Sequence, residues 1–275
     1  MPSPPTPLVP VLCAERGSGW RPTEDRIFTS DRVVAVLDGA SQPEATERDG
    51  GWLADQLGGE LMRQLRLDPR AELTQVLEDS IREVAKSHDL EPGESPATTV
   101  ALVRWDVDVL DVLVLCDSAV VALDRHGDVR EVRDDRLAVA TAALRRPAGP
   151  FTDDIDGWRG FAAEQHRVCN RPGGYWVAEA DPEAARHAVT ERWPVAEMSI
   201  VLAMTDGVSI GVDQYGVPHG WPEAIALAAD NPRRLVDSTH HAESGDLSCQ
   251  RWPRSKRHDD KALAVLRFDR IDGDH

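Results

Sequence analysis

The stretch VVAVLDGAS, residues 33–41, decides the fold because it places a carboxylate and a glycine where an apolar run ends. Residues 33–37 are apolar and mostly β-branched, which predicts a strand interior, and Asp38-Gly39 stops the run before a useful helix can form. Asp38 is therefore expected at a strand end. Asp-Gly is also ordinary turn chemistry, so this pair alone is weak evidence for a functional site.

Acids occur in similar settings at two further places. Asp206-Gly207 follows the apolar run 200–204, and Asp259-Asp260 precedes the apolar run 262–268. Each acid again stands where an expected strand meets a loop. This recurrence indicates several carboxylates gathered at strand ends, which an isolated turn would not require.

A hairpin is expected to bring two more acids to the same place. Residues 26–28 predict a short strand that pairs with 33–37. The two ends of such a hairpin lie on one side, so Glu24 and Asp25 would return to Asp38. Carboxylates this close repel one another unless a cation holds them together.

The remaining patterns predict blocks of helices and blocks of strands. Helices are expected over residues 49–67, 71–86, 182–187, 222–229 and 232–243. Further strands are expected over residues 11–14, 98–107, 109–115, 120–124, 129–132, 174–178 and 198–205. The middle of the chain then forms an antiparallel meander. The element order favours an α+β fold, a four-layer α-β-β-α sandwich of two antiparallel sheets flanked by helices.

Composition argues against several classes of partner and site. The 275 residues include 48 acidic and 31 basic side chains, a net charge of −17, which disfavours nucleic acid or an anionic membrane as the main partner. The four cysteines form no CxxC pair, which argues against a structural zinc site and a disulfide framework. The sequence starts without the features of a targeting segment and contains no apolar run of membrane length, so we expect a cytoplasmic protein.

The length suits one large domain, and we expect residues 1–275 to form a single domain and a monomer. The proline-rich residues 1–10 are expected to be a flexible lead-in. Residues 140–176 have the weakest periodicity of the chain, with many glycines and prolines. We expect loops with at most one helix there, a pattern typical of functional loops on a rigid scaffold.

Taken together, the motifs resemble those of the metal-dependent serine/threonine protein phosphatases, type 2C or PPM, of the bacterial type. The resemblance runs from Arg21 to Phe268, and residues 95–99, SPATT, stand where the family has Gly-Ser-Thr-Ala or Gly-Thr-Thr before a strand. Any one motif is a common peptide, but their shared order makes chance similarity improbable. The other motifs that carry it are Glu24-Asp25, Val36-Leu37-Asp38-Gly39, Cys116-Asp117-Ser118, Thr205-Asp206-Gly207-Val208 and Asp259-Asp260-Lys261-Ala262.

The resemblance implies a pair of Mg²⁺ or Mn²⁺ ions and a metal-activated water that attacks the phosphorus of a phosphoserine or phosphothreonine in a protein or peptide. It implies that Asp38 bridges both ions and that the Gly39 carbonyl binds one of them. Asp206 and Asp260 would bind the other ion. Hard divalent ions take oxygen ligands, and a pair of them stabilises both the attacking and the leaving oxygen.

Other residues receive supporting roles. By resemblance, Asp25 would act partly through water, and Asp117 would help to hold a third, weaker ion. Arg21 would bind the phosphate through two parallel hydrogen bonds from its guanidinium group. Arg16 is a competitor for this role, and the alternative for Arg21 is an arginine on the surface without a role in the site. His258 adjoins the last acidic pair and could be the general acid for the leaving alkoxide, although a loop histidine without that role is the simpler interpretation.

Two departures from the family pattern support a different hypothesis. After Asp38-Gly39 the family usually continues with Gly-Gly-His, whereas this chain has Ala40-Ser41-Gln42-Pro43. Lys261 replaces the usual asparagine and could pair with Asp259 or compete with metal. The alternative function is a catalytically weak phosphatase-fold protein that binds a phosphorylated or regulatory partner. A metal-dependent hydrolase of a small phosphate ester is a third interpretation.

The remaining candidates have plainer interpretations. His240-His241 lie on a predicted polar helix without metal spacing and are expected on the surface. The basic run 251–257 is expected to be a solvated loop that could draw in a phosphoprotein. By resemblance, 140–176 is a flap that sets substrate choice. Its aromatic side chains could offer apolar contact to a peptide, and a self-packed loop that buries their rings is an equally good interpretation: Phe151, Trp158 and Phe161.

Overall fold

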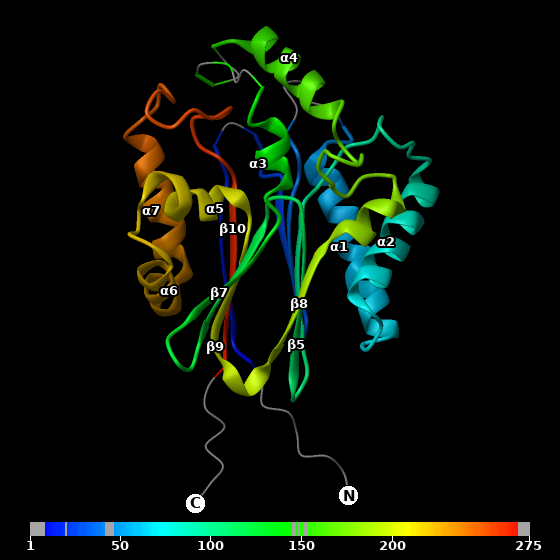
Figure 1. Ribbon diagram of the computed structural model, residues 1–275, viewed down its shortest axis with the longest axis vertical. Coiled ribbons are helices and arrows are strands. Elements are labelled where there is room, and N and C mark those ends of the chain that lie inside the picture. Colours follow the sequence, from blue (N-terminus) through cyan, green and yellow to red (C-terminus); the bar gives the residue numbers. More distant parts are fainter. Residues whose placement is uncertain are drawn as a thin grey trace, which may run out of the picture.

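Two antiparallel sheets of five strands each lie face to face, with helices on both outer sides (Figure 1). This arrangement confirms the predicted α+β sandwich. The computed structural model describes residues 9–19, 21–41, 47–144, 147, 149–150 and 153–268. The first sheet has the order β1-β10-β9-β6-β7, with β1 Val11–Arg16, β10 Lys261–Arg267, β9 Met198–Met204, β6 Ala119–Asp124 and β7 Val129–Arg133. The second has the order β2-β3-β4-β5-β8, with β2 Asp25–Thr29, β3 Val33–Asp38, β4 Val100–Trp105, β5 Val109–Leu115 and β8 Val189–Pro194.

Each sheet is covered on its outer face by its own set of helices. Helices α1 (Gly50–Leu67) and α2 (Leu73–His88) pack on the second sheet. The first sheet is covered by α5 (Asp206–Ile210), α6 (Trp221–Asp230) and α7 (Pro232–Ser244). The other helical elements are α3 (Arg136–Thr141), α4 (Ile155–His166), η1 (Pro182–His187), η2 (Val195–Glu197) and η3 (Gly211–Tyr215).

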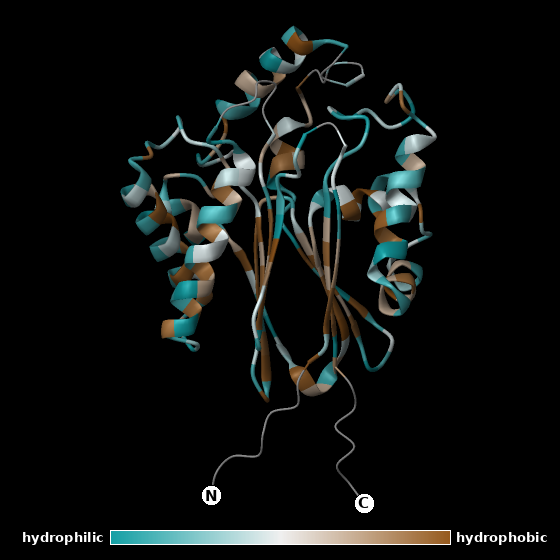
Figure 2. Cartoon of the chain, turned by 180° about the vertical axis from the view of Figure 1, so that it is seen from behind, coloured by the Kyte–Doolittle hydropathy of each residue, from teal (hydrophilic) through white to brown (hydrophobic). Residues whose placement is uncertain are grey.

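The run 33–37 is apolar throughout because β3 is buried on both faces. Alternate residues of a strand point to opposite faces, so Val33, Ala35 and Leu37 pack toward α1 and α2. Val34 and Val36 pack between the two sheets. Figure 2 shows the same division along the chain, with hydrophobic residues concentrated on the strands and hydrophilic ones along the outer helices.

The predicted meander in the middle of the chain is wrong. β4 and β5 pair within the second sheet, whereas β6 and β7 pair within the first. The chain crosses between the sheets at residues 116–118, where Cys116 has a left-handed φ of 66°. Both sheets are covered on both faces, so apolar runs alone do not tell which sheet a strand joins.

Two strand predictions also differ from the structure. Residues 174–178 form no regular strand, since Tyr175 and Ala178 make only isolated bridges, to Cys169 and Thr98. The sequence analysis missed β8, whose VTERWP sequence leaves three residues in a row exposed. As an edge strand beside β5, β8 needs only one partner, and its sequence therefore carries a weak apolar pattern.

The two irregular segments are described only in part. Of the predicted lead-in 1–10, residues 1–8 lie outside the described residues. Within 140–176, the twelve-residue helix α4 lies above the sandwich (Figure 1), and Phe151 is outside the described part. No helix among the described residues is both long enough and apolar enough to cross a membrane.

Two glycines of α1 provide a test of how closely this helix approaches the end of β3. A Cβ added at Gly50 would lie 2.4 Å from the backbone nitrogen of Ala40 and 2.4 Å from the carbonyl carbon of Gly39, whereas nothing lies within 4 Å of one added at Gly59. We expect Gly50→Ala to lower the free energy of unfolding by about 1–3 kcal/mol through overpacking. Gly59→Ala, at an exposed helical position, should raise it by about 0.5–1 kcal/mol.

Urea denaturation of the two variants beside the parent measures both changes. A Gly50→Ala variant as stable as the Gly59→Ala variant would contradict the close contact between α1 and the chain after β3.

Candidate metal centre

Five aspartates converge where strands of both sheets end. Asp25 begins β2 and pairs directly with Asp38, the last residue of β3, as the hairpin prediction required. Asp206 begins α5 just after β9, and Asp117 lies in the crossing between β5 and β6. Asp259 stands two residues before β10.

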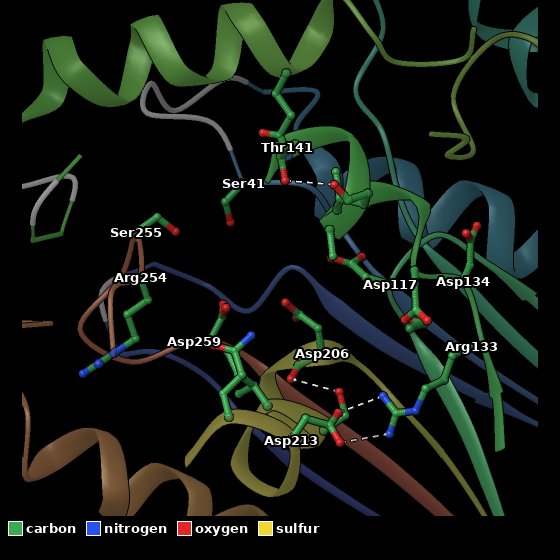
Figure 3. A pocket seen from close by; sticks show the side chains of 18 of the residues that line it. Ser41, Asp117, Arg133, Asp134, Thr141, Asp206, Asp213, Arg254, Ser255 and Asp259 are labelled. Atoms are coloured by element: carbon green, nitrogen blue, oxygen red, sulfur yellow. Dashed lines mark hydrogen bonds and ion pairs between the residues drawn. The ribbon is translucent and has the colours of Figure 1, made fainter. Parts of the chain in front are cut away.

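A cavity of about 360 Å³ opens at this edge. Asp117, Asp206 and Asp259 line it and direct their side chains toward the same space (Figure 3). Helix α4 forms part of the wall through Trp158 and Phe161. Helix α4 therefore lies beside the acidic edge, and the flap with its role in substrate choice stays a prediction.

Burial and like charge disfavour ionisation of four of these aspartates, whereas the charge of Lys256 lowers the pKa of the fifth, Asp259. Burial raises the pKa of Asp25 to about 7. Burial and the charges of Asp25 and Asp206 raise the pKa of Asp38 well above its ordinary value. Burial also raises the pKa of Asp117, and burial together with the charge of Asp259 raises that of Asp206. The group cannot be fully ionised without added positive charge nearby.

The backbone of Asp38 is held by the threonines of the motif at 95–99. Thr98 Oγ1 donates to the Asp38 carbonyl at 2.9 Å, and the Thr99 amide donates to the same oxygen at 2.9 Å. Thr99 Oγ1 also accepts from the Asp38 amide at 3.2 Å and lies 2.6 Å from Ser118 Oγ. These contacts fix the end of β3 against the start of β4.

Thr205 holds the side chain of Asp25 from the other sheet. Its hydroxyl donates to Asp25 Oδ2 at 2.8 Å and accepts from the Ala262 amide at 3.0 Å. The other carboxylate oxygen of Asp25, Oδ1, is buried and has no hydrogen-bond partner among the described residues. A buried carboxylate oxygen without a donor needs a water or a cation.

Asp260 does not lie where the sequence analysis placed it. Its carboxylate oxygens accept from the backbone amides of Ser18, at 2.6 Å, and Glu24, at 3.1 Å. It is buried, and backbone amides occupy both of its oxygens, whereas its neighbour Asp259 lines the cavity. Successive residues of an extended chain point to opposite sides, so only one of this pair faces the cavity. Asp259 therefore replaces Asp260 in the candidate ligand set.

Lys256 supplies a positive charge to the acidic cluster, and the sequence analysis did not single it out. Its Nζ lies 2.5 Å from Asp259 Oδ1, and its side chain is only 10% exposed. Burial alone would lower the pKa of Lys256, but the charges of Asp259, Asp38 and Asp260 outweigh burial and raise it. The only signal in the sequence was a lysine inside a basic run.

That basic run is not the solvated loop that was predicted. Arg254 is buried and donates to Asp246 Oδ2 at 3.0 Å, which ties the loop to the end of α7. Arg257, on the exposed side, pairs with Asp153 at 3.1 Å. The loop 251–257 is therefore built by ion pairs, one of them with the acidic cluster through Lys256.

The other predicted site residues lie outside the cavity. Neither Arg21 nor His258 is among its described lining residues. The His258 ring instead faces Glu243 of α7, with Nδ1 3.2 Å from Oε2. Lys261 is fully buried and pairs with the same Glu243 at 2.7 Å, so it does not pair with the Asp259 side chain as proposed. The buried Gly39 lies at the end of β3, and its carbonyl remains a predicted ligand.

The residues present fit hard divalent cations. All five convergent side chains offer carboxylate oxygens, the ligands that Mg²⁺ and Mn²⁺ prefer. A cation in this place would favour the ionised form of the carboxylates whose pKa is raised. It would also provide a partner for the unpartnered oxygen of Asp25. This donor set contains no thiol or imidazole, which would favour softer metals.

Comparisons with known proteins agree with this geometry. The family model for protein phosphatase 2C matches residues 21–230, while no curated protein matches the sequence. The fold is similar to the catalytic domain of the serine/threonine protein phosphatase PstP with two manganese ions, at 16% identity and a TM-score of 0.57 over 94% of this chain and 97% of that one. It is also similar to the PPM phosphatase MsPP from Mycobacterium smegmatis with cacodylate, at 15% identity and a TM-score of 0.58 over 94% and 97%.

A third similar structure is the serine/threonine phosphatase Stp1 from Staphylococcus aureus, at 11% identity and a TM-score of 0.58 over 96% of both chains. At these identities the structures establish the fold alone. Because the sequence match spans well over half of its length, the chain belongs to the protein phosphatase 2C family.

Proposed function

We propose that the chain is a metal-dependent protein phosphatase that hydrolyses phosphoserine and phosphothreonine at a dinuclear Mg²⁺ or Mn²⁺ centre. The observation that carries this proposal is the convergence of five aspartates at one edge of the sandwich in a member of a phosphatase family. Asp117, Asp206 and Asp259 line the cavity, and Asp25 and Asp38 pair beside it. The structure of PstP, a similar protein, holds two manganese ions.

The proposed ligands divide by position. Asp38 would bridge the two metal positions, with Asp25 paired beside it, and the Gly39 carbonyl would join one of them. Asp206 and Asp259 would hold the other position from the first sheet and the loop before β10. When bound, the divalent ions would supply an activated water as the nucleophile and positive charge beside the phosphoryl oxygens. A third ion at Asp117 stays a prediction.

The chain's own residues shape the rest of the site. Thr98 and Thr99 fix the Asp38 backbone, so that its carboxylate enters the centre with little freedom. Trp158 and Phe161 of α4 give the cavity an apolar wall for a peptide that flanks the phosphorylated residue. Neither the Arg21 nor the His258 role gains support, because neither residue lines the cavity.

One observation favours the second candidate, a phosphatase-fold protein that binds a phosphorylated or regulatory partner with little turnover. Lys256 already pairs with Asp259, a proposed ligand, and its charge competes with a metal ion for that carboxylate. The arrangement of the other four aspartates still favours the enzyme.

The first prediction is metal-dependent hydrolysis of para-nitrophenyl phosphate. We expect turnover with Mn²⁺ or Mg²⁺ and none after full chelation by EDTA, because the nucleophile depends on the bound ions. Release of para-nitrophenol measures the rate. Turnover that survives chelation would refute the mechanism, and no turnover with bound metal demonstrated would support the binding protein.

The second prediction separates Asp259 from Asp260. Asp259→Asn should abolish the rise in melting temperature that Mn²⁺ causes, and Asp38→Asn should do the same. Asp260→Asn should keep that rise but melt lower at every metal concentration, because one of its two backbone hydrogen bonds is weakened, at about 1–2 kcal/mol. Calorimetry with and without Mn²⁺ distinguishes them. The opposite pattern would restore Asp260 as the ligand.

The third prediction concerns Lys256. Lys256→Met removes the competing charge, so Mn²⁺ should bind roughly tenfold more tightly, which corresponds to about 1.4 kcal/mol. The metal-free variant should melt lower, since the acidic cluster loses its resident cation. Arg257→Met is the matched control, because Arg257 belongs to the same loop but is half exposed and pairs with Asp153. Titration calorimetry measures both affinities, and weaker Mn²⁺ binding by Lys256→Met would show that the lysine supports the centre.

A further inference from the structure

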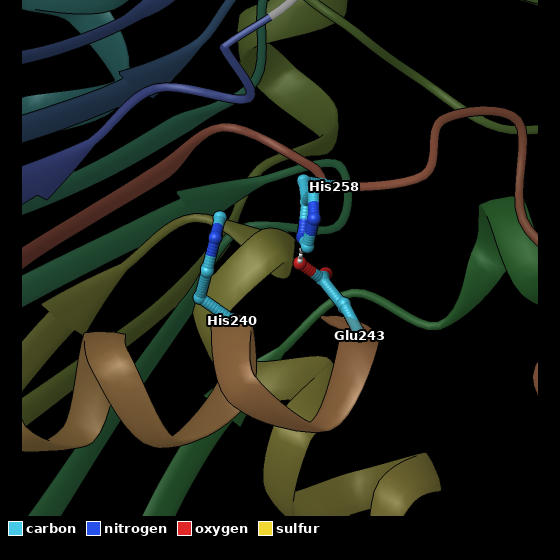
Figure 4. Close-up of side chains that lie close together, drawn as sticks. All are labelled: His240, Glu243 and His258. Carbon is cyan, nitrogen blue, oxygen red and sulfur yellow. Dashed lines mark hydrogen bonds and ion pairs between the residues drawn. The ribbon is translucent and has the colours of Figure 1, made fainter. Parts of the chain in front are cut away.

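A second cluster of ligand-type side chains lies behind the acidic cavity, on α7. His240 and Glu243 stand three residues apart on this helix, and His258 reaches them from the loop before β10 (Figure 4). One ligand atom from each of the three lies within 4.8 Å of the other two. The expectation that His240 is a surface residue is therefore wrong, whereas His241 is exposed as predicted.

Glu243 is the buried member of the cluster, His240 and His258 are partly exposed, and the contacts of the three side chains satisfy them only in part. The Glu243 side chain is 0% exposed, and its Oε2 is 2.7 Å from Lys261 Nζ and 3.2 Å from His258 Nδ1. Glu243 Oε1 and His240 Nδ1 are both buried, yet neither has a hydrogen-bond partner among the described residues. Two unpartnered buried atoms of this kind at one place point to a bound water or a bound ion.

The donor set differs from that of the acidic cavity. Two imidazoles and one carboxylate suit Zn²⁺ and neighbouring late transition metals, which commonly take three protein ligands and one water. The His258 side chain is 17% exposed, which leaves a path for solvent.

We propose that His240, Glu243 and His258 form a transition-metal site of the Zn²⁺ type, separate from the Mg²⁺ or Mn²⁺ centre. The metal takes Glu243 through Oε1 while Lys261 keeps Oε2, so the buried lysine retains its partner. The two imidazoles stack at 3.9 Å with an angle of 12° between their planes. They must turn out of this parallel stack to direct a nitrogen each at one ion.

The site is connected to the acidic cavity through one peptide bond. His258 precedes Asp259, the proposed ligand that lines the cavity. A metal held by His258 would fix the chain at the point where Asp259 leaves it. The binding step itself does not rest on the proposed phosphatase activity.

The test uses the full chain, stripped of metal and kept in excess Mg²⁺, titrated with Co²⁺ and then with Zn²⁺. We expect the visible absorption of Co²⁺ with nitrogen ligands and its loss on addition of Zn²⁺. His240→Ala and His258→Ala should each weaken Zn²⁺ binding by at least about tenfold. His241→Ala is the matched control, because this neighbour on α7 is exposed and should leave binding unchanged.

The outcomes are distinct from those for the phosphatase. Circular dichroism melting checks that each variant folds, and His258→Gln provides a second variant if the alanine form does not. The absence of a Co²⁺ band in the parent, or equal Zn²⁺ affinity in the parent and both histidine variants, would overturn the proposal. Neither result depends on phosphate hydrolysis, so a failure here and a failure of the proposed function are separable.

Discussion

The mutual repulsion of buried aspartates is the constraint on which this structure depends. Asp25 and Asp38 face one another across a β-ladder, and Asp206 and Asp259 reach the same edge from the other side of the sandwich. Carboxylates that are close together and partly shielded from water stay ionised only beside positive charge. The chain itself provides one such charge, Lys256. The protein therefore combines a fixed internal charge with a site for exchangeable ones.

Close backbone contact keeps the acids in place despite their repulsion. A Cβ at Gly39 would lie 2.2 Å from the carbonyl carbon of Gly50, and one at Gly207 would lie 1.9 Å from the Asp260 carbonyl oxygen. In both Asp-Gly pairs the glycine thus permits close approach of another segment, and neither has a positive φ. These close approaches fix the backbone on which the carboxylates stand, so their repulsion must be offset by positive charge nearby.

How far the site could be predicted depends on what fixes each residue. Asp38 and Asp206 end apolar strands, so strand patterns locate them. Asp259 and Asp260 differ in which side of the chain they point to. Because both are aspartates, the sequence does not tell which one faces the cavity. Lys256 and His258 were harder still, because their partners Asp259 and Glu243 come together only through the path of the loop before β10. The sequence did not show that the chain passes from one sheet to the other at Cys116, because the strands of both sheets are equally apolar.

The four residues 258–261 lie in three different surroundings. Asp259 faces the acidic cavity, and Asp260 accepts backbone hydrogen bonds from the loop between β1 and β2. His258 and Lys261 both turn to Glu243 on α7, outside the sandwich. A change in charge in the acidic cavity therefore acts on a segment that is already fixed to Glu243 of α7, and a change at Glu243 acts on a segment that already faces the cavity. The position of Asp259 is consequently determined as much by the buried Lys261–Glu243 pair behind it as by the aspartates in front of it.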